Sequence, residues 1–73
     1  MSAEVRVEHF RRAYERWDGF SESMLRAISM SYVLKPEEKQ EISNRAIPLY
    51  HWARGLTVSY GAAMREAYEE SVR

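Results

Sequence analysis

Residues 7–31 read VEHFRRAYERWDGFSESMLRAISMS, and apolar or small side chains recur in this stretch at alternating spacings of three and four. Such spacing keeps side chains on one face of an α-helix and is typical of helices that pack side by side. The other face carries charges four residues apart, such as Glu8 and Arg12, which predicts that it faces solvent. We therefore predict one long amphipathic helix over residues 4–34. We call its recurring positions the heptad seam: Val7, Phe10, Tyr14, Trp17, Ser21, Met24, Ile28 and Ser31.

The two prolines divide the rest of the chain. Lys35 and Pro36 mark the end of the first helix, because proline disfavours helix at the residue before it and suits the first turn of a helix. Pro48 is expected to break or sharply kink the chain. With three glycines and two prolines there is little room for β-hairpin turns. We predict a single all-α domain over residues 1–73, a helical hairpin or three-helix arrangement with helices at 4–34, 36–46 and 48–72.

Small residues recur every fourth position in the last helix, at Gly55, Ser59, Ala63, Ala67 and Ser71. A ridge of small side chains allows another helix to approach closely. The large side chains of the first helix are the expected partners of this ridge. Leucine at Ala63 is therefore expected to overpack the contact.

Composition excludes several classes of protein. The 73 residues include 11 Lys+Arg and 11 Asp+Glu, a formal net charge of zero, with 45% hydrophobic residues and no cysteine. Disulfide frameworks and thiol chemistry are therefore excluded. We expect no membrane span, because no apolar run approaches the ~20 residues that one requires. Without the apolar stretch of a signal peptide we expect a cytoplasmic protein.

Residue patterns for catalysis or metal binding are absent from the sequence. His9 and His51 lack the Glu-x-x-His spacing of di-iron helical bundles. No nucleophile motif surrounds a serine, and no glycine-rich phosphate loop occurs. We therefore expect no enzyme activity, no cofactor and no metal. A ligand-binding or anion-binding helical dimer stays open as an alternative, with Arg6, Arg45 or Arg54 as the candidate anion-binding residues.

A hairpin of this length buries only about 60% of the surface that its unfolded chain exposes and is marginally stable, so we expect a homodimer or higher oligomer that also binds another protein. Nine arginines against two lysines suggest a bacterial or phage origin. The expected function is that of a regulatory interaction module, such as an adaptor, inhibitor or accessory subunit. The expected interface residues are Phe10, Tyr14, Trp17, Phe20, Met24, Ile28, Trp52, Leu56, Tyr60, Ala63 and Met64. A separate surface patch is expected at Met30, Val33, His51, Arg54, Val58 and Ala62.

Residues 3–33 also resemble the ribbon-helix-helix repressors. Residues 4–8, EVRVE, alternate as a strand does, and residues 19–23, GFSES, are similar to the Gly-x-Ser-x-Ser turn that opens the second helix of that family. The resemblance implies a small dimeric DNA-binding regulator in which Arg6 reads bases in the major groove.

Zero net charge predicts no appreciable affinity for duplex DNA at physiological salt, because phosphate contacts supply much of such binding. A gel shift at nanomolar protein concentration measures this. A shifted band that Arg6→Ala weakens would contradict the prediction and support the ribbon-helix-helix alternative.

Overall fold

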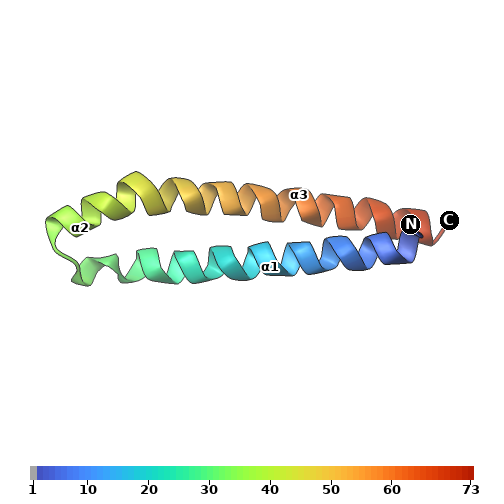
Figure 1. Ribbon diagram of the computed structural model, residues 1–73, viewed down its shortest axis with the longest axis horizontal. Helices are drawn as coiled ribbons and strands as arrows, with labels where there is room; N and C mark the ends of the chain where they lie inside the picture. Colours follow the sequence, from blue (N-terminus) through green and yellow to red (C-terminus); the bar gives the residue numbers. More distant parts are fainter. Residues whose placement is uncertain (1) are drawn as a thin grey trace.

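The computed structural model describes residues 2–73, which form two long antiparallel helical arms joined at one end (Figure 1). The first arm is α1 (Ala3–Ser29), which ends in a 3₁₀ turn, η1 (Met30–Val33). The second arm runs without interruption through α2 (Pro36–Glu41), a π-helical turn η2 (Ile42–Ala46) and α3 (Ile47–Ser71). The two termini lie together at the open end. The all-helical hairpin is therefore confirmed, and residues 2–73 contain no strand.

Local signals set the ends of α1. The Ser2 side chain accepts a hydrogen bond from the Val5 N–H at 3.2 Å and so caps the first turn. At the other end the prediction of α-helix to residue 34 is wrong, because α1 ends at Ser29 and tightens into η1. Leu34 and Lys35 are extended, with ψ of 159° and 158°. Pro36 accounts for the extended backbone of Lys35, because the proline ring excludes the helical conformation from the preceding residue.

Of the break or sharp kink predicted at Pro48, the break is wrong. Ala46 and Ile47 both have right-handed helical backbone angles, so α2, η2 and α3 form one continuous rod. A proline ring normally collides with the carbonyl four residues earlier. Here the chain widens into a π turn just before the proline, and the Ile47 N–H donates to the Ile42 carbonyl five residues back. This wider turn accommodates the ring without ending the helix.

The two arms meet along matching heptad positions. In α1 these are the heptad seam, and in α3 they are positions with the same alternating spacing, among them Ala53, Thr57 and Ala67. These three residues and Ser21 are the buried residues of the described chain. The most deeply buried positions of both arms therefore carry small side chains. Larger side chains also meet between the arms, as at Phe10 and Tyr60, whose ring centroids are 6.4 Å apart.

The ridge of small residues faces α1 along part of its length. Ala67 is fully buried and Ala63 is half-buried, whereas Gly55 and Ser59 are exposed. A side chain added at Gly55 would meet nothing within 4 Å. The expectation that the whole ridge packs on α1 is therefore wrong. Positions four apart advance about 40° around a helix at each step, so such a row cannot stay on one partner.

The hairpin is a single layer of helices. Its extents are 55 × 15 × 15 Å, and its radius of gyration is 16.4 Å. A globular chain of this length has a radius of gyration of about 11 Å. Within residues 2–73 no helix combines the length and apolar character needed to cross a membrane.

Ala67→Leu should lower the free energy of unfolding by about 1–3 kcal/mol, because the added atoms have no space between the helices. Ala62→Leu is the control, since Ala62 is exposed on the same helix and leucine is a good helix former. Urea unfolding of both variants measures the difference. Equal losses would show that α3 presents another face to α1.

Candidate interaction surface

The hairpin has two long sides with different chemistry. Trp52 and Arg54 are two residues apart in α3, so they lie about 200° apart around the helix. Phe20 and Asp18 are likewise two residues apart in α1 and lie on different sides of that helix. Trp52 and Phe20 both contact Trp17 on one side of the molecule, while Arg54 and Asp18 pair on the other.

Aromatic rings gather on the first side. The Trp17 and Trp52 ring centroids are 5.2 Å apart with the planes at 85°, and those of Trp17 and Phe20 are 5.8 Å apart at 88°. This edge-to-face geometry is favourable for aromatic pairs. Trp17 is half-buried between the arms, but Trp52 remains 55% exposed and Phe20 42% exposed. The rings are therefore held in place while much of their surface faces solvent.

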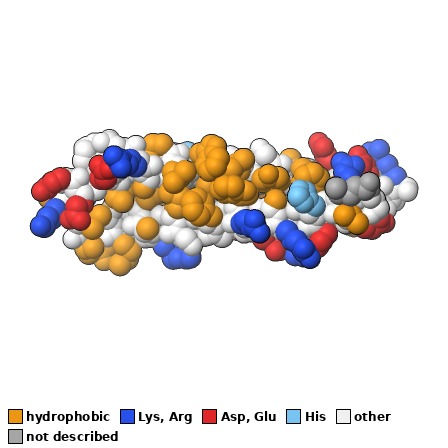
Figure 2. Space-filling view, viewed as in Figure 1, with side chains coloured by type: hydrophobic (Ala, Val, Ile, Leu, Met, Phe, Trp, Pro, Cys, Tyr) orange, Lys and Arg blue, Asp and Glu red, His pale blue; other side chains and the backbone are white. Residues whose placement is uncertain are grey.

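This cluster is part of a longer apolar surface, which we call the aromatic stripe: Phe20, Leu49, Trp52 and Leu56. Leu49 is 42% exposed and Leu56 is half-buried. On α3 the stripe continues to Ser59 with spacings of three and four, and these positions carry no charge. Figure 2 shows hydrophobic side chains gathered over the middle of the molecule, with mixed charged side chains at its two ends and Lys or Arg side chains below the hydrophobic patch.

The opposite side is organised by a polar cluster. Arg54 Nη1 donates to Asp18 Oδ1 at 2.9 Å and to Ser21 Oγ at 3.1 Å, and the Ser21 hydroxyl donates to the Asp18 carbonyl at 2.9 Å. The hydrogen bond to Asp18 raises the pKa of Arg54 above its ordinary value. These contacts join α1 to α3 and give the buried Ser21 hydroxyl both a donor and an acceptor.

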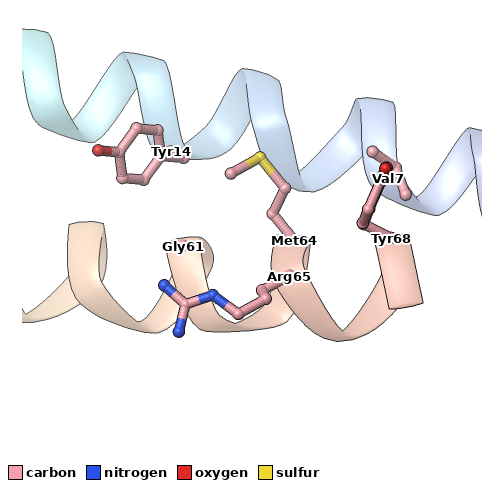
Figure 3. Close-up of a pocket in the computed structure, with 6 residues that line it drawn as sticks. All are labelled: Val7, Tyr14, Gly61, Met64, Arg65 and Tyr68. Atoms are coloured by element: carbon pink, nitrogen blue, oxygen red, sulfur yellow. The ribbon is translucent and has the colours of Figure 1, made fainter. Parts of the chain in front are cut away.

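Next to this cluster lies an open groove of about 390 Å³ between α1 and α3, which we call the tyrosine groove (Figure 3). Gly61 lines the groove opposite Tyr14 and has no side chain to fill it. In Figure 3 the Met64 side chain reaches towards α1, and the Arg65 side chain runs along α3 towards Gly61. The residues that line the groove are Val7, Tyr14, Gly61, Met64, Arg65 and Tyr68.

Further ion pairs lie on the solvated surface. Arg6 Nη1 and Glu70 Oε2 are 2.6 Å apart and join the open ends of α1 and α3. Along α1, Glu8 accepts hydrogen bonds from Arg11 and Arg12, and these bonds lower the pKa of Glu8. The hydrogen bond with Glu8 likewise raises the pKa of Arg11.

The predicted interface residues fall into two groups. One group is partly buried between the two arms: Phe10, Tyr14, Trp17, Met24, Ile28, Tyr60 and Met64. The other group lies on or beside the aromatic stripe, where Phe20 and Trp52 are exposed and Leu56 and Ala63 are half-buried.

The predicted surface patch does not form one surface. Met30 and Val33 are exposed at η1, where the arms are joined, whereas His51, Val58 and Ala62 are exposed along α3. Arg54 is half-buried and paired with Asp18.

The three arginines considered for anion binding each have a carboxylate partner. Arg6 pairs with Glu70, Arg45 with Glu41, and Arg54 with Asp18. They lie on separate parts of the hairpin and do not converge on one site. Residues 2–73 contain no group of three or more His, Asp or Glu side chains placed to hold a metal ion.

The ribbon-helix-helix architecture is wrong for this chain. Residues 4–8, the expected strand, form the first turns of α1, and Gly19 lies within the same unbroken helix. Arg6 therefore projects from a helix and pairs with Glu70.

The sequence analysis did not predict the Asp18–Arg54 ion pair or the packing of the Tyr14 ring on Gly61. The available signal was the alternating spacing that Ala53, Thr57 and Tyr60 share with the heptad seam, which fixes the buried face of α3. Arg54 directly follows a seam position and therefore lies at the edge of that face. The sequence matches no protein-family model, and no curated protein or solved structure is significantly similar to the chain.

Gly61→Ala should stabilise the hairpin less than Gly19→Ala does. Both glycines are inside helices, where alanine is favoured by about 1 kcal/mol. A Cβ at Gly19 meets nothing within 4 Å, whereas one at Gly61 lies 3.3 Å from the Tyr14 ring, which has to move. Thermal unfolding of the two variants gives the comparison. An equal gain would show that Tyr14 does not rest on Gly61.

Proposed function

We propose that this chain is a non-enzymatic protein–protein interaction module whose aromatic stripe is covered by another polypeptide. Adaptors, inhibitors and accessory subunits all work in this way. The observation that carries the proposal is the ring cluster of Trp17, Phe20 and Trp52, of which Trp52 is 55% exposed.

The composition of the stripe supports the proposal. Interface centres are enriched in aromatic residues and depleted of charge, and tryptophan is prominent among the residues that dominate binding energy. The stripe combines one tryptophan, one phenylalanine and two leucines with uncharged neighbours on α3. Scattered apolar side chains are common on protein surfaces, but a contiguous group of them marks a surface that other molecules contact.

The rigidity of the stripe gives further support. Trp52 contacts Trp17, which is itself held between the two arms, so its ring is positioned before any partner arrives. A partner therefore loses little free energy in ordering these side chains. The polar side of the hairpin differs in this respect, because its charges at Asp18 and Arg54 already satisfy each other.

Capture on immobilised protein tests the proposal, with Trp52→Ser as the stripe variant. Tyr68→Ser is the matched control, because Tyr68 is a similarly exposed aromatic residue, at 57%, and it lines the tyrosine groove on the other side. Polypeptides retained from a cell lysate, or untagged copies of this chain, should be lost with Trp52→Ser and kept with Tyr68→Ser. Equal retention by both variants, or no retention by the unchanged protein, would contradict the proposal.

A further inference from the structure

We infer that the polypeptide covering the aromatic stripe is a second copy of this chain, so that two hairpins pack stripe to stripe as a four-helix bundle. This inference rests on the proposed function and identifies the partner.

The hairpin exposes more surface than a compact protein of its mass. The accessible surface of the hairpin is 5531 Å². A folded monomer of 8.6 kDa exposes about 4,700 Å² by the usual scaling of surface with mass. The excess, about 800 Å², equals the area that each partner buries in an interface of standard size. One contact of ordinary dimensions would therefore give each copy the exposed surface of a compact protein.

The hairpin buries few hydrophobic side chains. The fully buried hydrophobic residues among positions 2–73 are two alanines, Ala53 and Ala67. Helices become stable when an apolar face is buried against a second layer, and the hairpin supplies a single layer. Stacking two hairpins through the stripe adds Phe20, Leu49 and Trp52 of each copy to a shared core.

The α3 half of the aromatic stripe can face a second copy without charge repulsion. In a two-fold dimer the same surface of each copy meets its equivalent, so any charge near the axis would face a like charge. From Leu49 to Ser59 the stripe side of α3 is uncharged. The ion pairs Asp18–Arg54 and Arg6–Glu70 lie on the other side of the hairpin and at its open end. On the α3 half of this surface a second copy therefore meets no charge, while on the α1 half the exposed Arg16 lies one turn before Phe20.

The surface beside the rings has room for a second hairpin. Ser59 is exposed, and nothing lies within 4 Å of a side chain added at Gly55. Both residues are small and neighbour Trp52 on α3, so the tryptophan of a second copy fits over them. Close packing between helices needs this alternation of large and small side chains.

Sedimentation equilibrium at micromolar concentration tests the inference. The unchanged protein should have twice its chain mass of 8.6 kDa. Ser59→Arg should raise the dissociation constant of the dimer about 30-fold or more, because it brings like charges together at the interface. Ser59 is exposed, so the substitution leaves the packing of the single hairpin intact. Tyr68→Arg is the matched control, since Tyr68 is exposed on the side of α3 that lines the tyrosine groove and should leave the dimer unchanged.

The outcomes separate the two proposals. A helical monomer at all concentrations that still captures another polypeptide through Trp52 would overturn the homodimer and leave the interaction module standing. A monomer that captures nothing would overturn both. A dimer weakened by Tyr68→Arg but not by Ser59→Arg would show that the copies meet through a different face, which also overturns the inference.

Discussion

The packing of α1 against α3 along their heptad positions is the contact on which the whole structure depends. Ala53, Thr57 and Ala67 of α3 and Ser21 of α1 are its buried residues, and the Tyr14 ring of α1 lies over Gly61 of α3. Small residues on one helix let the two axes approach closely, and the long side chains of the other helix fill the space between them. The two arms remain side by side over the full 55 Å of the molecule as a result.

The same contact explains why the aromatic stripe remains exposed. A narrow line of packing at heptad positions uses about a third of each helix surface, and the apolar surface of both helices extends beyond it. Trp17 lies at the boundary, where it packs between the arms and also supports Trp52 and Phe20. Apolar faces wider than one line of packing are typical of helices in bundles with more than one neighbour. One hairpin supplies a single neighbour for each of its helices.

Much of the fold could be predicted from the sequence. The alternating spacing from Val7 to Ser31 identifies the long first helix, because periodicity reports directly which side chains share a face. The behaviour of Pro48 could not be predicted, because a π turn and a break both relieve the clash of the proline ring. Tertiary packing along α3 favours the continuous helix. The ridge at Gly55 and Ser59 misled the prediction, because fourth-residue spacing drifts around a helix.

The exposure and pairing of individual side chains could not be predicted from the sequence. Trp52 and Trp17 both look like core residues by type, and sequence alone does not show that one is half-buried while the other is 55% exposed. Pairing across the hairpin, as between Asp18 and Arg54, depends on the register of the two arms, which is set by the turn near Pro36 and by the π turn.

The central claim is that the hairpin is completed by covering its aromatic stripe with another copy. The most direct measurement is the midpoint of thermal unfolding, followed by circular dichroism, over about a hundred-fold range of protein concentration. If folding and association are coupled, the midpoint rises steadily with concentration. A midpoint that stays constant over the whole range would show that one hairpin is complete by itself and would contradict the account.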